Sequence, residues 1–329
     1  MKKIALIATF IVLTAVAIFQ IRNMVSSRDQ PLPEPVRMAY LQNDIHHLAL
    51  WVALDKGFFR DEGVDVQISG IFRAGPEIMN AFSAGALDMA YVGEAPSTFA
   101  VANVKSDVKV VAQVNTEGSA LVVAAGQTDI EDVSALKGKN VAIPGHATVQ
   151  DFLLKKALTT AGVDPSEVNL IILKPPEMIG ALRSGQIDAF IAWEPYPSKA
   201  FIAGVGRVLA GSHDIWPDHP CCVLVSDTAF MEAHPARVAK VLRAHVRATD
   251  FIKANPEEAL RVGVKYTGMD KATVRKALRS VTYTYIPSIE GEKEYVRFLS
   301  ELGYIKVSDP DSFVSGFIKS GLLDRIEDR

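Results

Sequence analysis

Apolar and polar positions in the first third of the chain follow two spacings in turn. The stretches 36–41, 64–69 and 89–92 have the apolar content of strands. Between them, 47–59 and 76–84 carry apolar residues at helical spacing. Strands that alternate with helices are typical of a parallel α/β sheet, and this is the predicted fold class.

The same alternation starts again further along the chain. Strands are predicted at 141–144, 168–174 and 187–193, and helices at 149–161 and 176–184. The chain therefore contains two α/β units with the same order of elements.

The two units also match residue by residue when one is shifted by one hundred positions. Residues 75–88 then lie over 175–188, with Pro, Glu, Ala, Gly and Asp recurring in register, and Glu94 falls on Glu194. Proline begins a helix and glycine ends one, so helix boundaries account for part of the match. Because the match continues to the two glutamates, we interpret it as an internal repeat.

Two such units create a cleft where the loops at the carboxyl ends of their strands face each other. The first lobe is predicted to comprise 36–126 and 222–329, and the second 127–221. The strand at 222–225 is expected to cross back to the first lobe. Two crossings form a hinge that closes on a ligand. Each lobe is expected to hold a mainly parallel sheet flanked by helices.

The N-terminal segment has the features of an export signal. Two lysines precede an apolar run over 4–21, which is long enough either for a signal peptide or for a retained membrane anchor. Residues 1–25 are therefore predicted as signal or anchor, and the proline-spaced segment 26–35 as a linker. This places the protein in the periplasm or elsewhere outside the cytoplasm, either free or held at the inner membrane.

Composition excludes some classes of protein. The 329 residues are 49% hydrophobic and 22% charged, which is enough to bury the cores of two domains. The formal net charge is −3, and lysines and arginines are scattered rather than clustered. No nucleic-acid partner is expected.

The chain has two cysteines, Cys221 and Cys222, which are adjacent. Consecutive side chains on a strand point to opposite faces, so a disulfide between them would be strained. We interpret them as buried core residues. The nearby His213, Asp218 and His219 match no zinc-binding spacing, so neither a metal site nor a cofactor is expected.

Several segments, taken together and in order, resemble the type II periplasmic binding fold. Within that fold they resemble the group that binds nitrate, sulfonates and taurine, which also includes binding proteins for a thiamine pyrimidine precursor. The segments are 49–59, 62–66, 84–88, 93–96, 136–139, 141–145, 185–189 and 193–195. The resemblance spans about 36–265. It implies the substrate-binding component of an ABC importer, which delivers a small solute to a membrane permease and its ATPase.

Loops at the expected cleft supply the candidate ligand-binding residues. Family members use the loop after Pro144 for ligand contact, which makes His146 and Thr148 the strongest candidates. Asp44 has the alternative role of capping the first helix. One of His46 and His47 is expected to face the cleft and the other to pack or meet solvent. The full predicted set is Asn43, Asp44, His46, His47, Arg73, Gly93, Glu94, Ser97, Gly145, His146, Ala147, Thr148, Trp193 and Glu194.

The charges in these loops leave the ligand open. Arg73, the histidines and the helix N-termini favour an anionic head group, whereas Asp44, Glu94 and Glu194 favour an amine or amide. A taurine-like zwitterion satisfies both sets, and a bare nitrate leaves the carboxylates unused. Aromatic residues such as Trp193 would instead sandwich a pyrimidine ring.

Two other functions compete with solute transport. An enzyme on the same fold would use Glu and His for acid–base chemistry, but the sequence has no nucleophile motif, phosphate-binding glycine loop or metal pattern. A non-enzyme is therefore expected. A membrane-attached sensor subunit is compatible with the retained-anchor alternative.

Overall fold

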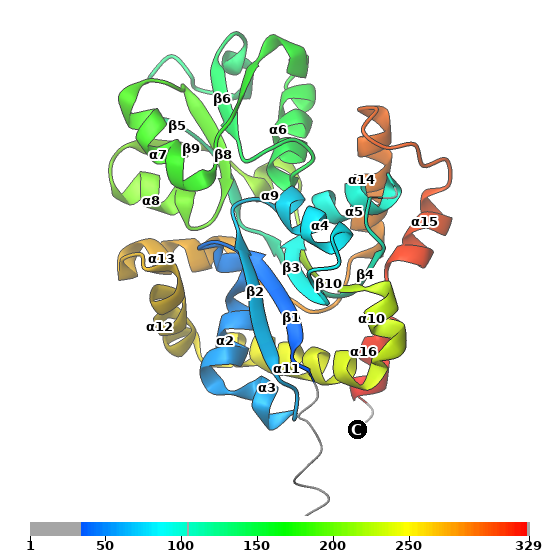
Figure 1. Ribbon diagram of the computed structural model, residues 1–329. Helices are drawn as coiled ribbons and strands as arrows, with labels where there is room; N and C mark the ends of the chain where they lie inside the picture. The colour runs from blue at the N-terminus through cyan, green and yellow to red at the C-terminus, as the bar shows by residue number, and fades with distance from the viewer. Residues whose placement is uncertain (1–33, 104, 328–329) are drawn as a thin grey trace, which may run out of the picture. The chain divides into compact units, whose positions relative to one another are not determined.

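Two β-sheets organise the described part of the chain (Figure 1). The computed structural model describes residues 34–103 and 105–327, so the predicted signal or anchor and most of the linker lie outside it. From Val36 onward the chain forms one unit. Within the described residues, no helix combines the length and the apolar character needed to cross a membrane.

The first sheet has six strands in the order β11-β4-β10-β3-β1-β2. Its strands are β1 (Val36–Leu41), β2 (Val66–Phe72), β3 (Met89–Gly93), β4 (Val108–Glu117), β10 (Pro220–Asp227) and β11 (Val281–Tyr283). Strand β1 pairs in parallel with β2 and β3, whereas β10 is antiparallel to β3 and β4, and β11 is antiparallel to β4.

The second sheet has five strands in the order β7-β6-β8-β5-β9. Its strands are β5 (Ser119–Ala124), β6 (Asn140–Ile143), β7 (Asn169–Ile172), β8 (Ala189–Trp193) and β9 (Gly206–Gly211). Strand β6 pairs in parallel with β7 and β8, and β5 is antiparallel to β8 and β9. The parallel core β7-β6-β8 repeats the core β2-β1-β3 of the first sheet.

Mixed pairing corrects the expectation of mainly parallel sheets. The repeated units supply the parallel strands close to their predicted positions, but β4, β5 and β9 are absent from the predicted elements. Strand β4 runs in the same direction as β3, and the strands that enter a sheet from a crossing are reversed: β10 runs against β3 and β4, and β5 runs against β8. Strand β5 already belongs to the second sheet, ahead of the predicted lobe limit at 127.

Helices flank the sheets. In the repeated units they are α2 (Leu48–Lys56), α3 (Phe58–Asp61), α4 (Gly75–Ser83), α5 (Glu94–Ala102), α6 (Val149–Thr160), α7 (Pro175–Ser184), α8 (Tyr196–Ile202) and α9 (Ser212–Ile215). The C-terminal helices are α10 (Thr228–Ala233), α11 (Pro235–Ala254), α12 (Pro256–Thr267), α13 (Lys271–Ala277), α14 (Ile289–Glu301), α15 (Pro310–Phe317) and α16 (Gly321–Glu327). Short 3-10 turns are η1 (Ile45–His47), η2 (Val133–Leu136), η3 (Pro165–Glu167) and η4 (Leu278–Ser280).

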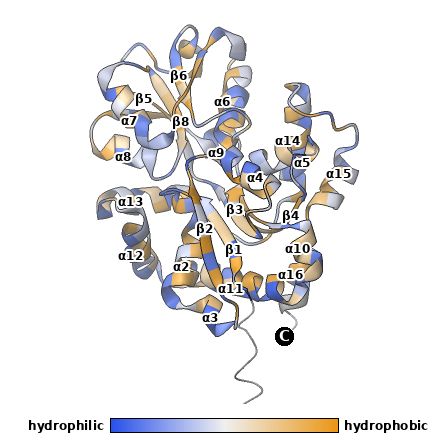
Figure 2. Cartoon of the chain, viewed as in Figure 1, coloured by the Kyte–Doolittle hydropathy of each residue, from blue (hydrophilic) through white to orange (hydrophobic). Residues whose placement is uncertain are grey.

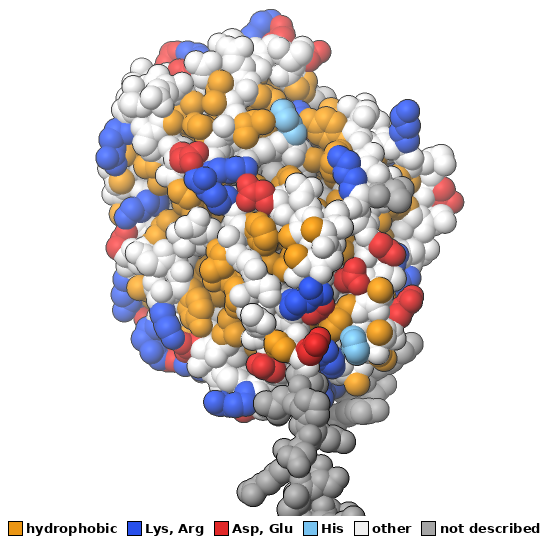
Figure 3. Space-filling view, in the orientation of Figure 1, with side chains coloured by type: hydrophobic (Ala, Val, Ile, Leu, Met, Phe, Trp, Pro, Cys, Tyr) orange, Lys and Arg blue, Asp and Glu red, His pale blue; other side chains and the backbone are white. Residues whose placement is uncertain are grey.

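The helix predicted over 47–59 is divided at Gly57. This glycine has φ of 75°, the left-handed conformation that ends α2, and its N–H donates to the last carbonyls of that helix. Strands β3, β8 and the first seven residues of β10 are buried throughout, and Figure 2 shows the apolar colouring of the central strands. On the face drawn in Figure 3, basic and acidic side chains are interspersed.

The chain crosses between the sheets at two adjacent points. Strand β4 ends at Glu117, and one residue, Gly118, separates it from β5; the second crossing runs from α9 to β10. The N–H of Glu117 donates to the carbonyl of His219 at 3.0 Å. Its carboxylate accepts from the N–H of Asp218 at 2.8 Å and lies 2.6 Å from Nδ1 of His213. The two crossings are therefore bonded to each other and form the hinge.

Gly118 occupies a position that requires glycine. Its φ is +87°, and a Cβ added there would overlap Nε2 of His46 and a methyl group of Val281. Its carbonyl oxygen accepts the N–H of Glu194 at 2.8 Å and lies 2.9 Å from Nε2 of His46. The first crossing thus holds a loop of each lobe through one oxygen.

We expect Gly118→Ala to lower the free energy of unfolding by about 3 kcal/mol or more, because backbone strain and steric overlap add. Gly138→Ala is the matched control, since Gly138 has φ of +74° but no atom within 4 Å of the added Cβ. It should cost only about 1 kcal/mol. Urea denaturation measures both, and equal losses would contradict the role assigned to the His46 contact.

Candidate functional site

A small buried cavity lies where loops from both sheets meet. It is lined by Leu41, Asp44, His46, Gly75, Gly93, Pro96, Thr148, Val149, Gln150, Trp193, Cys221 and Cys222. Its volume of about 10 Å³ accommodates a single water molecule or ion. An organic ligand therefore enters only if the two walls move apart.

Three helix N-termini border this cavity. Gly75 is the first residue of α4, Gly93 is the N-cap of α5, and Thr148 is the N-cap of α6. The Thr148 hydroxyl accepts the N–H of Asp151 at 3.2 Å and donates to the carbonyl of Gly145 at 2.8 Å. Helix N-termini present free N–H groups and the positive end of the helix dipole, so they favour an anionic or acceptor group.

Asp44 caps η1, which was the alternative role considered for it. Its Oδ1 accepts the N–H of His46 at 3.0 Å and lies 3.2 Å from Nδ1 of the same residue. Burial raises the pKa of Asp44 to about 7, because it outweighs the attraction of His46. Burial alone would lower the pKa of His46, but Asp44 and Cys221 raise it to about 9. The two side chains thus retain at least one proton near neutral pH.

His46 and His47 have different surroundings. His46 lines the cavity, whereas Nδ1 of His47 accepts the N–H of Leu41 at 3.1 Å. The His47 ring packs edge-on against Tyr40 and Tyr91. Burial lowers the pKa of His47 well below its usual value, so it is neutral and belongs to the core.

Arg73 lies outside the cavity, on the exposed rim. Its guanidinium pairs with Glu177, and the ammonium of Lys174 lies 3.2 Å from Glu77. Glu77 and Glu177 are partners in the internal repeat. Each also accepts the backbone N–H at the start of its own helix, from Arg73 and Lys174 respectively. The repeat therefore produces two reciprocal ion pairs between the lobes.

Glu94 does not line the cavity. Its carboxylate accepts from the amide of Gln113 at 3.1 Å and meets Glu292, which accepts the hydroxyl proton of Thr98 at 2.6 Å. Burial raises the pKa of Glu94 to about 7, and burial together with Glu94 raises that of Glu292 well above its usual range. Glu94 thus opposes the ionisation of Glu292 inside the first lobe.

Glu194 faces away from the small cavity as well. Its carboxylate accepts the N–H and the hydroxyl of Ser198 at 3.1 and 2.9 Å, at the start of α8. With Lys276 and Arg279, it lines a separate cavity of about 450 Å³. Burial raises the pKa of Glu194 to about 7. The two repeat-related glutamates are therefore not opposite walls of one pocket.

The remaining predicted residues surround the cavity without lining it. The His146 side chain is 57% exposed and lies 3.9 Å from Asp151. The Ala147 N–H donates to Asp151, and the Ser97 hydroxyl donates to the carbonyl of Glu94. Asn43 and Gly145 complete this group. Of the predicted set, five line the cavity: Asp44, His46, Gly93, Thr148 and Trp193.

Gln150, Cys221 and Cys222 line the cavity but are absent from the predicted set. Gln150 lies in the first turn of α6 and donates to the hydroxyl of Ser119 at 2.9 Å. The sequence could have pointed to Gln150 because it lies two residues after Thr148, which was predicted to contact the ligand. For the cysteines the signal was weaker, namely their position on the strand expected to cross between the lobes.

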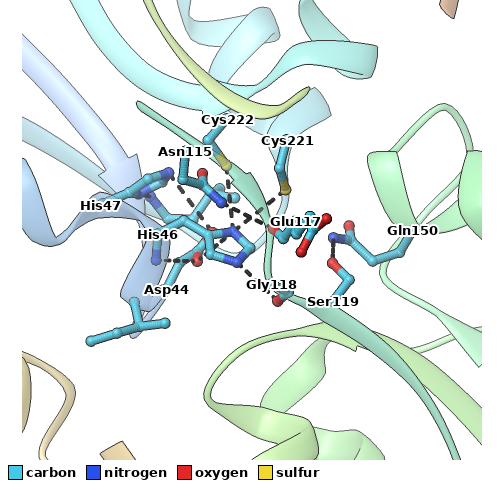
Figure 4. Close-up of polar contacts among 12 residues, drawn as sticks. Asp44, His46, His47, Asn115, Glu117, Gly118, Ser119, Gln150, Cys221 and Cys222 are labelled. Carbon is cyan, nitrogen blue, oxygen red and sulfur yellow. Dashed lines mark hydrogen bonds and ion pairs between the residues drawn. The ribbon is translucent and has the colours of Figure 1, made fainter. Parts of the chain in front are cut away.

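The two cysteines are free, and each Sγ lies 3.6 Å from Nδ1 of His46 (Figure 4). Burial raises the pKa of Cys221, but the neighbouring Cys222 thiol and His46 more than offset this and bring it well below its usual value. Burial and Cys221 raise the pKa of Cys222 well above its usual value. Two sulfur atoms and one imidazole nitrogen thus lie together on one side of the cavity, which we call its floor.

Comparison with known proteins identifies the family. Residues 29–264 match the NMT1-like family, and the chain belongs to it. A protein of Brucella abortus (strain 2308) assigned as a binding protein is 30% identical over 243 residues, covering 73% of this chain and 74% of the relative. One of Bacillus subtilis (strain 168), assigned as an aliphatic sulfonates-binding protein, is 30% identical over 237 residues, or 70% of each chain.

Solved structures confirm the two-lobed periplasmic binding fold. The periplasmic nitrate-binding protein NrtA from Synechocystis PCC 6803 superposes with a TM-score of 0.81 at 16% identity, covering 91% of this chain and 90% of that one. The alkanesulfonate-binding protein SsuA from Xanthomonas axonopodis pv. citri, bound to MOPS, gives 0.76 at 18% identity, covering 88% and 100%. At these identities the likeness establishes the fold.

The raised pKa of Glu194 predicts a pH dependence of stability. Above pH 4.5 the unfolded chain ionises this group freely, whereas the folded chain keeps its proton until about pH 7. Stability should therefore fall between these pH values and then level off. Relative to Glu194→Gln, the wild type should lose on the order of 3 kcal/mol between pH 4.5 and 8.

Urea denaturation across this pH range measures the difference, with Glu301→Gln as the control for removal of an exposed carboxylate. Parallel profiles for wild type and Glu194→Gln would show that Glu194 is ionised in the folded protein.

Proposed function

We propose that this chain is the extracytoplasmic solute-binding component of an ATP-driven importer, and that its solute is a small molecule with an anionic head group, such as an aliphatic sulfonate. One observation carries the proposal: helix N-termini from both lobes converge on one polar cavity. The family relationship supports the transport role, with a membrane permease and its ATPase as partners.

The lining of the cavity favours recognition by N–H groups rather than by side-chain cations. No lysine or arginine is among the residues that line it in the described part of the chain. The second amide hydrogen of Gln150 and backbone N–H groups in the first turns of α4, α5 and α6 are the available donors. The Thr148 hydroxyl joins them when its proton turns from the Gly145 carbonyl to the ligand. A sulfonate presents three oxygens that such a set can satisfy without a counter-ion.

Binding is favoured over catalysis by the arrangement around His46. A nucleophile–base–acid triad needs the thiol and the carboxylate on opposite imidazole nitrogens. Here Asp44 Oδ1 and the Cys221 sulfur lie 3.2 and 3.6 Å from the same atom, Nδ1, and Nε2 is bonded to a carbonyl. This geometry does not relay a proton from thiol to carboxylate.

Trp193 supports a second candidate ligand, a pyrimidine or similar heterocycle. Its ring lines the cavity, and its indole N–H is buried with no hydrogen-bond partner among the described residues. A flat ligand with an acceptor atom would pack against this ring and accept that proton.

Thermal unfolding with candidate solutes tests the proposal. We expect an alkanesulfonate or taurine to raise the melting temperature, because a ligand of the folded state stabilises it by mass action, by about 2.7 kcal/mol at one hundred times Kd. Nitrate and pyrimidines belong in the same screen. A pyrimidine that shifts the melting temperature while sulfonates do not would replace the sulfonate assignment.

Thr148→Val should abolish most of the ligand-induced shift, and Thr160→Val should preserve it, since Thr160 is exposed at the other end of α6. Loss of the cap lowers basal stability by about 1 kcal/mol, so the shift rather than the basal temperature is the measure. Equal shifts in both variants would mean that the solute binds elsewhere.

A further inference from the structure

Three donor atoms from distant parts of the chain converge at the floor of the small cavity. The Sγ atoms of Cys221 and Cys222 each lie 3.6 Å from Nδ1 of His46, and the three atoms are mutually within 4.8 Å. All three residues are buried and line the cavity. In Figure 4 the imidazole of His46 lies between the two thiols and Asp44.

These spacings suit tetrahedral coordination. Zinc bonds of about 2.3 Å to sulfur and 2.0–2.1 Å to nitrogen place the two donors about 3.5 Å apart at a tetrahedral angle. The observed sulfur–nitrogen distances of 3.6 Å agree with this value. Oδ1 of Asp44, 3.2 Å from Nδ1, is the nearest oxygen donor for a fourth position.

The orientation of His46 is fixed by its other nitrogen. Nε2 lies 2.9 Å from the carbonyl oxygen of Gly118, which can only accept, so Nε2 carries a hydrogen. Nδ1 therefore directs its lone pair, or an exchangeable proton, at the two sulfurs. Metal-binding histidines typically donate their second N–H to a carbonyl or carboxylate in this way.

Acidic groups outnumber basic ones among the buried residues. Among the described residues, six carboxylates are buried, namely Asp44, Asp88, Glu94, Asp151, Glu194 and Glu292, against a single buried lysine, Lys155, and no buried arginine. Lys155 pairs with Asp151. Oδ2 of Asp44 and Nε2 of His47, both beside Cys222, have no hydrogen-bond partner. The 10 Å³ space here is of the size of one ion.

We propose that His46, Cys221 and Cys222 bind a thiophilic divalent cation of the Zn²⁺ class. On binding, each thiol loses a proton to solvent and forms a metal–sulfur bond, and Nδ1 of His46 releases the proton it carries to solvent and donates the freed lone pair. Two thiolates balance the charge of the ion, so the buried site becomes neutral. The ion does not need the proposed solute in order to bind, and it would form the floor against which a solute packs once the walls move apart.

Cobalt titration of the reduced, chelator-treated full chain tests this site. We expect one Co²⁺ per chain, with a thiolate-to-cobalt charge-transfer band in the near ultraviolet and the intense visible bands of tetrahedral cobalt. Zinc should displace the cobalt and remove both. Cys221→Ser, Cys222→Ser and His46→Ala should each weaken cobalt affinity at least tenfold.

His146→Ala is the matched control, because His146 is an exposed histidine that does not line the cavity, and the variant should bind cobalt like the wild type. Wild-type protein without a charge-transfer band, or a band that persists in both cysteine variants, would overturn the proposal. So would a disulfide between the two cysteines in the protein as isolated. Cobalt titration of the wild type tests the proposal even if a variant fails to fold.

The solute screen separates this proposal from the proposed function. Cobalt binding without any solute-induced shift would retain the metal site and remove the transport assignment. A sulfonate-induced rise in melting temperature without a thiolate–cobalt band would retain the transport assignment and remove the metal site.

Discussion

The carbonyl oxygen of Gly118 is the point on which the site depends. It accepts the backbone N–H of Glu194 from the second lobe and the imidazole N–H of His46 from the first, and it lies between β4 and β5. One atom therefore fixes a loop of each lobe relative to the crossing strand. Only a residue without a side chain allows both contacts at φ of +87°, because any Cβ would occupy the space of the imidazole.

Desolvation of acidic groups is the second constraint. Asp44 and Glu194 accept N–H groups at helix starts, which favours their ionised forms, and Glu94 lies beside Glu292. Burial outweighs these contacts and raises the pKa values of all four groups, since a buried charge without a cation is costly. The floor of the cavity combines two thiols and an imidazole, and no lysine or arginine is among the described residues that line it, which supports the proposed metal ion.

The internal repeat also places ion pairs between the two lobes. Glu77 and Glu177 each cap their own helix and each pair with a basic residue of the other lobe, Lys174 and Arg73. Exposed pairs of this kind contribute about 1 kcal/mol or less each. They can bias the two lobes toward this arrangement but cannot hold it alone, and such a small bias is compatible with the opening that the proposed function requires.

The sequence by itself determined the parallel strands and flanking helices of both repeats, the capping role considered for Asp44, and the burial of Cys221 and Cys222, because periodicity and capping are local properties. The structure added the cap at Thr148. Only the tertiary structure decided that β10 runs antiparallel to β4 and β5 antiparallel to β8, and that His46 meets cysteines 175 and 176 positions away. It also decided that Glu94 is enclosed in the first lobe whereas Glu194 lines a separate cavity. Glu94 and Glu194 are equivalent in the repeat but do not line one cleft, because they have different neighbours. Glu94 bonds to Gln113 of strand β4, whereas Glu194 bonds to Ser198 at the start of α8. The physical reason is that the pattern of apolar residues along one element shows which of its faces is buried. Which buried polar groups meet depends instead on how the chain crosses between the two sheets.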